Sequence, residues 1–114
     1  MPLRLQVSNN PYLVLEDRHA DTFKQIAATF SEIKRVLIFG SRAVGNADKG
    51  SDIDLALIGE DVTHSTVLRF YDLLNEETLI PYYIDVIDYK TIQNAELKEH
   101  IDRMGVIVYE KQAS

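Results

Sequence analysis

Two spacings of apolar residues alternate along the chain. Three segments place apolar residues three or four positions apart, as in a helix with one buried face, and three short runs of β-branched or aromatic residues are typical of strands. The alternation predicts a small α/β sandwich. Its predicted elements are a helix at 16–31, a strand at 35–39, a turn of helix after residue 40, a strand at 53–58, a helix at 64–77 that Thr63 or Asp61 caps, a strand at 82–88, a short helix at 95–104 and an apolar piece at 106–109.

The length and composition fit one folded unit. With 114 residues, 46% of them hydrophobic, the chain can build one core but not two domains. We expect a loose arm at 1–15 and a single domain at 16–114. No apolar run approaches the roughly 20 residues that cross a bilayer, and the first residues are too polar for a signal peptide, so we expect a cytoplasmic protein without membrane association. The absence of cysteine excludes disulfides, thiolate metal sites and cysteine nucleophiles.

Acidic residues are concentrated in the middle of the chain. From residue 40 to residue 90 there are ten Asp or Glu against four Lys or Arg, so this half carries the whole formal charge of -6. General nucleic-acid binding is not expected, because such proteins usually present a basic stripe. Concentrated acid fits metal binding or docking to a basic partner. Four of these ten acids are better explained as residues on solvent-exposed helix faces: Glu60, Asp61, Glu76 and Glu77.

A glycine turn and a pair of aspartates mark the candidate chemistry. The first predicted strand ends at Gly40 and Ser41, where glycine allows a sharp turn and serine can cap a following helix. Asp52 and Asp54 open the second predicted strand, and alternation along a strand places both on one face. Two adjacent carboxylates repel each other unless a cation lies between them. We therefore expect a hard divalent metal such as Mg²⁺ here, with phosphate nearby.

A third acid is expected from the next strand. Asp85 and Asp88 are an odd number of residues apart, so they face opposite sides and only one can join the pair. Asp85 lies in the middle of the strand, where an ionised carboxylate is costly to bury without a partner. Asp88 stands at the strand end near Lys90. We place Asp85 beside the aspartate pair and treat Asp88 as structural.

The remaining polar candidates give weaker signals. Arg42 either contacts phosphate or forms a salt bridge with Asp48. No two histidines have the spacing of a zinc site on one helix, and His19 is expected at the surface. Ser51 and Lys49 lie in the loop before the carboxylates and are minor candidates.

These motifs resemble a known signature. Gly40-Ser41, ten intervening residues, Asp52-x-Asp54 and the later strand acid Asp85 resemble the DNA polymerase β-type nucleotidyltransferase superfamily. The stretches GSRAVGNADKGSDIDLALIG and ELKEHIDRMGVIVYE are more closely similar to the minimal nucleotidyltransferases, small proteins often encoded beside a HEPN-domain protein. The resemblance covers nearly the whole chain from residue 16 onward. It implies a polymerase β-like nucleotidyltransferase core, in which helices pack a small mixed β-sheet.

The resemblance also implies a reaction and a set of site residues. The reaction is metal-dependent transfer of a nucleotide to an acceptor hydroxyl, as AMP from ATP or as another nucleotide from its triphosphate. Two Mg²⁺ ions, or Mn²⁺, would be held by the three aspartates. Asp52, Asp54 and Asp85 would be the catalytic and metal-binding residues. The family often has a second arginine where this chain has Val44, which leaves that position without a phosphate role. The nucleotide-binding candidates are Gly40, Ser41, Arg42 and Ser51.

The partner and the class of function follow from the same resemblance. It implies that the acceptor is a tyrosine on a helical HEPN toxin, which would make this chain the antitoxin of a hetero-oligomer. The alternative is a non-catalytic nucleotide-binding subunit, or an antitoxin that neutralises its partner by contact alone. The intact glycine turn and three acids favour the enzyme. A single α/β layer would leave the carboxylate face open to water, so we expect a partner, or a second copy of the chain, to cover it.

Overall fold

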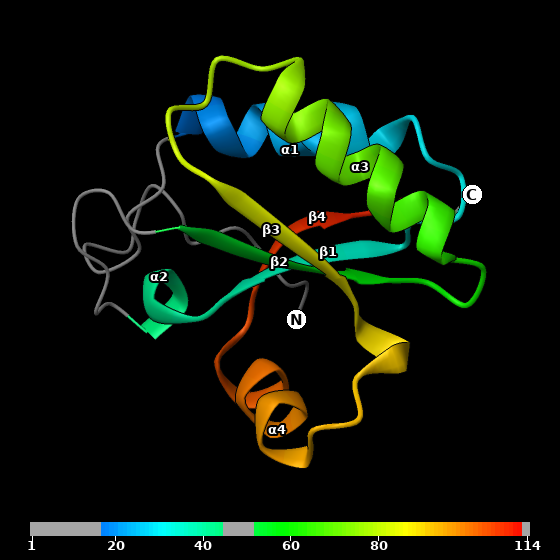
Figure 1. Cartoon of the computed structure of the whole chain (residues 1–114), viewed down its shortest axis with the longest axis vertical. Coiled ribbons are helices and arrows are strands. Elements are labelled where there is room, and N and C mark those ends of the chain that lie inside the picture. The colour runs from blue at the N-terminus through cyan, green and yellow to red at the C-terminus, as the bar shows by residue number, and fades with distance from the viewer. Residues whose placement is uncertain (1–16, 45–51, 113–114) are drawn as a thin grey trace.

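The computed structural model describes residues 17–44 and 52–112 of the chain. In chain order its elements are α1 (Asp17–Ala28), β1 (Arg35–Phe39), α2 (Ser41–Val44), β2 (Ile53–Ile58), α3 (His64–Glu76), β3 (Ile84–Asp88), the 3₁₀ helix η1 (Tyr89–Thr91), α4 (Ala95–Met104) and β4 (Val106–Glu110). The strands form one sheet in the order β3-β2-β1-β4 (Figure 1). β1 pairs antiparallel with β2 and with β4, whereas β2 and β3 run parallel. The predicted mixed sheet packed by helices is therefore confirmed.

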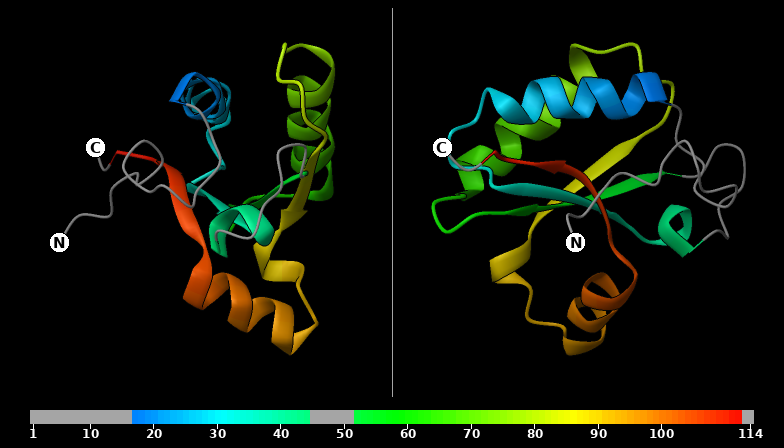
Figure 2. Two further views of the ribbon diagram at one scale, coloured as in Figure 1. Left: turned by 90° about the vertical axis from the view of Figure 1, so that its left-hand side faces the viewer. Right: turned by 180° about the vertical axis from the view of Figure 1, so that it is seen from behind.

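One face of the sheet is covered by α1 and α3. Side chains that point to this face, among them Ile53, Leu55 and Ile84, are fully buried with Phe23 of α1 and Phe70 of α3. Figure 2 shows both helices on the same side of the strands. Each such side chain contributes roughly 1.5–3 kcal/mol through the loss of its contact with water, so this face holds the main core.

The opposite face is covered by α4, with η1 beside it. Leu37, Phe39 and Ala56 of the sheet pack there with Ile101 of α4 in a smaller cluster. Asp54 lies between two strand residues that point into the main core, so its side chain belongs to this second face. In Figures 1 and 2, α4 lies across the sheet from α1 and α3. The expectation of a single layer was therefore wrong, because the chain's own α4 covers part of the acidic face.

Most predicted elements are present, although several of their bounds differ from the predicted ones. β1, β2 and α4 have the predicted bounds, and the apolar piece at 106–109 is the strand β4. β3 begins at Ile84 rather than at residue 82. α1 ends at Ala28, three residues early, because the amides of Thr29 and Phe30 donate to carbonyls only three residues back, at 3.1 and 3.0 Å. The predicted arm at 1–15 lies outside the described residues.

The helix α3 begins with a reciprocal cap. Thr63 is the N-cap: its hydroxyl accepts from the Thr66 amide at 3.2 Å, and its own amide donates to the Thr66 hydroxyl at 3.1 Å. The Thr66 hydroxyl in turn donates to Glu32 at 2.8 Å. These bonds satisfy amides that the helix leaves open and tie its first turn to the segment before β1.

Within residues 17–44 and 52–112, no helix is both long and apolar enough to cross a membrane.

Candidate active site

The turn after β1 is made by a glycine that no other residue can replace without strain. Gly40 has a φ of 79°, in the left-handed region, and Ser41 begins the short helix α2 directly after it. A Cβ atom at Gly40 would lie 2.4 Å from Oδ2 of Asp54. The backbone therefore comes as close to the Asp54 carboxylate as a residue without a side chain allows.

The sheet brings the predicted acids to the same end of its second face. Asp54 pairs across the antiparallel ladder with Phe39, the residue before the glycine turn, and across the parallel ladder with Asp85 of β3. Asp52 lies just before β2 and is exposed, as is Asp85, whereas Asp54 is half-buried between them. Asp54 is thus the centre of a row that runs from the glycine turn across β2 to β3.

Electrostatics single out the middle carboxylate. Burial raises the pKa of the Asp54 carboxyl above its usual value, and the charges of Asp85 and Asp52 raise it further. The positive charge of Arg42 acts on the same pKa in the opposite direction, with a smaller effect. The negative charge on Asp54 is therefore disfavoured by its surroundings, which is the condition in which a bound cation would be most stabilising.

Arg42 lies at the site, but its side chain is buried, whereas a phosphate ligand would be exposed to solvent. Its residue is 1% exposed, its Nε donates to the carbonyl of Asp52 at 3.3 Å, and its guanidinium lies 4.4 Å from the centroid of the Tyr82 ring. Asp48, the predicted salt-bridge partner, lies outside the described residues. In this arrangement Arg42 holds the start of β2, and a direct phosphate contact would require its guanidinium to leave the Tyr82 ring.

His100 is the site residue that the sequence analysis missed. Although it belongs to α4, its Nε2 accepts a hydrogen bond from the Gly40 amide at 3.0 Å, and its ring meets Phe39 edge to face. The Gly40 N–H is therefore already hydrogen-bonded within the chain, so a nucleotide-binding role of Gly40 would have to use another part of the turn. A signal was present in the sequence, since Leu97, His100, Ile101 and Met104 share the spacing of one helix face.

A second histidine was also misplaced. His19 was expected at the surface, but it is buried in α1, with its ring edge to face against Tyr82 at a centroid distance of 5.9 Å. It lies four positions before buried Phe23, so the two side chains share one face of the helix, and this spacing could have predicted its burial. Tyr82 thus contacts both His19 and Arg42, and so connects α1 to the residue that holds the start of β2.

The other predicted positions divide into two groups. Asp88 has a structural role: its Oδ1 accepts from the Lys90 amide at 3.2 Å and caps η1, while its Oδ2 pairs with the Lys90 ammonium at 2.9 Å. Ser41 follows Gly40 as the first residue of α2. Ser51 and Lys49 lie outside the described residues.

The residues at the site have the chemistry that a divalent metal requires, but their side chains do not form a complete set of ligands around one point. Across the two described ranges, no three acidic or histidine side chains converge on one point as metal ligands. The donor set is nevertheless suitable, because hard divalent cations prefer carboxylate oxygens and would remove the repulsion around Asp54. Asp52, Asp54 and Asp85 are the side chains that would hold such a cation.

The described residues thus form one mixed sheet with helices on both faces, and a glycine turn lies against one strand acid that has two further acids beside it. This arrangement points to the class of nucleotidyltransferases. The family model "Polymerase beta, Nucleotidyltransferase" matches residues 21–114, and the chain belongs to this family. The recognition made from the sequence motifs is therefore confirmed, and the protein is a nucleotidyltransferase. Enzymes of this family generally use divalent metal ions.

A curated relative lies within the same family. The chain is 32% identical over 77 residues to the "Probable protein adenylyltransferase MntA" of Haemophilus influenzae, a match that covers 68% of this chain and 67% of the relative.

Solved structures share the fold. The structure described as "the toxin-antitoxin with AMP-PNP" superposes with a TM-score of 0.65 at 17% identity, covering 86% of this chain and 76% of the other. A mutant of the toxin-antitoxin MntA-HpeT gives 0.63 at 14% identity over 86% and 75%. At these identities the likeness supports the fold alone.

Proposed function

We propose that this protein transfers AMP from ATP to a hydroxyl group on a protein partner. The observation that carries the proposal is the position of Asp54, half-buried between Asp52 and Asp85 and in close approach to the Gly40 backbone. A nucleotidyltransferase needs carboxylates at the α-phosphate and an open path for the acceptor. This end of the sheet offers both, since Asp52 and Asp85 are exposed.

The reaction makes one bond and breaks one bond. The acceptor oxygen attacks the α-phosphorus of ATP, pyrophosphate leaves from the opposite side, and the hydroxyl proton is given up as the new ester forms. Asp52, Asp54 and Asp85 would hold divalent cations, two Mg²⁺ with Mn²⁺ as the alternative, which neutralise charge on the reacting phosphate when bound. Asp85 is the exposed acid on the far side of Asp54 from the turn, so we assign it the acceptor side and the uptake of the proton.

The nucleotide side of the site is the glycine turn. Gly40 lets the backbone approach closely, and Ser41 supplies a hydroxyl and an amide beside it. We assign the triphosphate to this turn, with Ser51 as a further ligand. Arg42 contributes by holding the start of β2 through the Asp52 carbonyl, and so places Asp52 itself.

An acceptor outside this chain is favoured over its own tyrosines. Tyr83 stands two residues before Asp85, but its hydroxyl is 3.0 Å from that of Tyr71. This hydrogen bond, together with the nearby acids, raises the pKa of Tyr83 to about 12, which makes its phenol a poor nucleophile. The names of the relative and of the toxin-antitoxin structures support a protein acceptor. We therefore assign the acceptor as a tyrosine of a HEPN-type toxin, with this chain as antitoxin.

The test uses the chain alone and together with the product of the gene next to its own. Both samples receive ATP labelled at the α-phosphate, Mg²⁺, and either the wild-type chain or the variants Asp54→Asn and Asp88→Asn. Label on a tyrosine of the partner, lost with Asp54→Asn and kept with Asp88→Asn, is the expected result. Tyr83→Phe controls for self-labelling.

Two outcomes would contradict the proposal. If the partner is bound and neutralised with no transfer of label, the chain is an antitoxin that acts by contact. If label appears only on a small-molecule hydroxyl, the enzyme assignment stands but the protein acceptor is wrong.

A further inference from the structure

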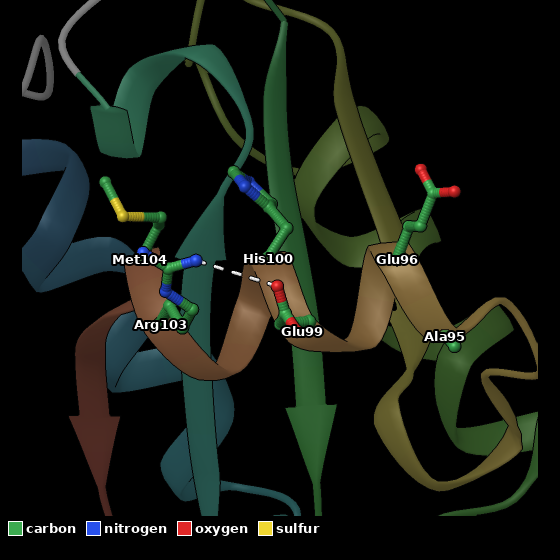
Figure 3. A pocket seen from close by; sticks show the side chains of 6 residues that line it. All are labelled: Ala95, Glu96, Glu99, His100, Arg103 and Met104. Atoms are coloured by element: carbon green, nitrogen blue, oxygen red, sulfur yellow. Dashed lines mark ion pairs between the residues drawn. The ribbon is translucent and has the colours of Figure 1, made fainter.

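His100 connects the last helix to the glycine turn across 60 residues of sequence. Its Nε2 lies 3.0 Å from the amide nitrogen of Gly40. Figure 3 shows its imidazole rising from α4 toward the chain at the end of β1, among the residues that line a pocket of about 450 Å³ on that helix. Because a backbone amide can only donate, the ring must present an unprotonated Nε2, and its proton must sit on Nδ1.

Three separate constraints meet at the glycine on the other side of this bond. The backbone of Gly40 has a positive φ, its Cα side faces the Asp54 carboxylate at the limit of close approach, and its N–H is directed at His100. Turns of this kind have neighbouring conformations of similar energy, since glycine restricts the backbone so little. The hydrogen bond to His100 selects one orientation of the peptide and therefore one spacing between the turn and Asp54.

We propose that His100 is a positioning residue. By accepting a hydrogen bond from the Gly40 amide it fixes the Gly40 peptide, and so holds the Asp54 carboxylate where nucleotidyl transfer requires it. The kinetic part of this inference rests on the proposed function. His100 touches neither nucleotide nor acceptor in this scheme, and it acts only through the turn. Misplacement of a reacting group by about 1 Å costs on the order of 100-fold in rate, so one such bond is sufficient to matter.

The competing explanation is that His100 only fills space beneath Phe39. The two explanations differ in what they ask of the side chain: packing needs a flat ring, whereas positioning needs an acceptor at the place of Nε2. His100→Phe keeps the ring and removes the acceptor. His100→Gln loses the ring, but its side-chain amide reaches about as far as Nε2 and offers an oxygen acceptor.

The experiment compares these two variants with a control from the same helix. Arg103→Gln is the control, because Arg103 lines the same pocket and its ion pair with Glu99, at 3.6 Å, is largely exposed and contributes little. Initial rates at varied ATP give kcat and KM, and a thermal melt checks that each variant is folded. We expect kcat to fall roughly 10- to 100-fold in His100→Phe with KM for ATP changed less than about threefold, to recover mostly in His100→Gln, and to stay unchanged in Arg103→Gln. A folded His100→Phe with wild-type kcat, or a His100→Gln no better than His100→Phe, would overturn the proposal.

A spectroscopic measurement on the wild-type chain keeps the inference testable without any activity. Long-range ¹H–¹⁵N spectra at pH 8 report which ring nitrogen carries the proton, and the Gly40 amide resonance reports its hydrogen bond. The Nδ1–H tautomer, with a Gly40 amide signal that moves in His100→Phe and not in Arg103→Gln, supports the contact. The Nε2–H tautomer would overturn it. Absence of nucleotide transfer by the wild-type chain would instead refute the proposed function, and the tautomer would still decide the contact.

Discussion

The close approach of Gly40 to Asp54 predicts that the smallest possible side chain at position 40 damages both stability and chemistry. In Gly40→Ala the new Cβ would lie 2.4 Å from Oδ2 of Asp54, whereas such atoms essentially never come closer than 3.0 Å. One group must therefore move by at least 0.6 Å, the difference between these distances. A φ of 79° adds about 1–2 kcal/mol for an L-residue, and overpacking adds roughly 1–3 kcal/mol. We expect the free energy of unfolding to fall by roughly 2–5 kcal/mol in total.

A double-mutant cycle separates the two terms. In an Asp54→Ala background the atom nearest to the new Cβ is the Asp54 Cβ position, at an ordinary 3.6 Å, so only the backbone term should remain. Gly40→Ala should then cost about 1–2 kcal/mol, which leaves a coupling energy of about 1 kcal/mol or more. Urea unfolding of the four proteins measures it. Equal costs of Gly40→Ala in both backgrounds would mean that the turn and the carboxylate are not in contact.

The catalytic consequence needs a control that also loses stability, but at a position away from the site. A shift of 0.6 Å or more at Asp54 should lower kcat by an order of magnitude or more, up to about 100-fold for 1 Å. Thr63→Ala removes the α3 cap, on the other side of the sheet, and should cost about 1 kcal/mol. For a chain of 114 residues that is a fall in Tm of about 4 °C. A Thr63→Ala variant that loses as much activity as Gly40→Ala would assign the loss to stability rather than to geometry.

Three further outcomes follow from the same site. Because the pKa of Asp54 is raised in the folded chain, its ionisation destabilises the protein as pH rises through that pKa. Asp54→Asn should therefore be more stable than wild type at pH 7 and lose this advantage below about pH 3.9. Urea unfolding from pH 3 to 8 measures the difference, and a constant difference would contradict the assignment. Asp85→Asn should lower kcat more than ATP affinity, whereas Asp88→Asn should leave both unchanged; titration of ATP against each variant decides, and equal losses would mean that the facing of β3 is wrong. Chelation should stop transfer and added Mg²⁺ or Mn²⁺ should restore it, so activity that survives chelator would rule out a metal-dependent reaction.

The elements of this fold were predictable from the sequence because their signals are local. The bounds of α4 and of both strands of the central hairpin were predicted. Of the two caps expected for α3, Thr63 or Asp61, the structure has Thr63. The third layer was not predictable in the same way. Whether α4 packs on the face of α1 and α3 or on the opposite face depends on the connection from β3 through η1, whose direction is a tertiary property. The single-layer expectation failed at that step.

The candidate site was predictable as far as it depends on strand parity. Alternation predicted that Asp52 and Asp54 share one face and that Asp85 and Asp88 do not. In the structure Asp85 pairs with Asp54 across the parallel ladder, and the charges of Asp85 and Asp52 both raise the pKa of the Asp54 carboxyl. The roles of His19, His100 and Arg42 depend on contacts with residues that are distant in the sequence, and these contacts leave no local signal in the chain. Helical spacing is compatible with an inward-facing histidine at both positions, but it does not identify the residue that the histidine contacts.

The three aspartates at this end of the sheet lower the stability of the folded chain, because their carboxylates repel one another around half-buried Asp54. Asp54 is half-buried beside two further acids, and Arg42 is buried with its guanidinium in contact with the Asp52 carbonyl and the Tyr82 ring. A salt bridge from Arg42 to Asp54 would have relieved the repulsion, and a neutral residue at position 54 would have avoided it. Strain of this kind persists where function requires it. Arg42 binds the Asp52 carbonyl and His100 binds the Gly40 amide, so both fix the backbone next to Asp54 rather than neutralise its carboxylate. The charge of Asp54 is therefore available to a cation from solution.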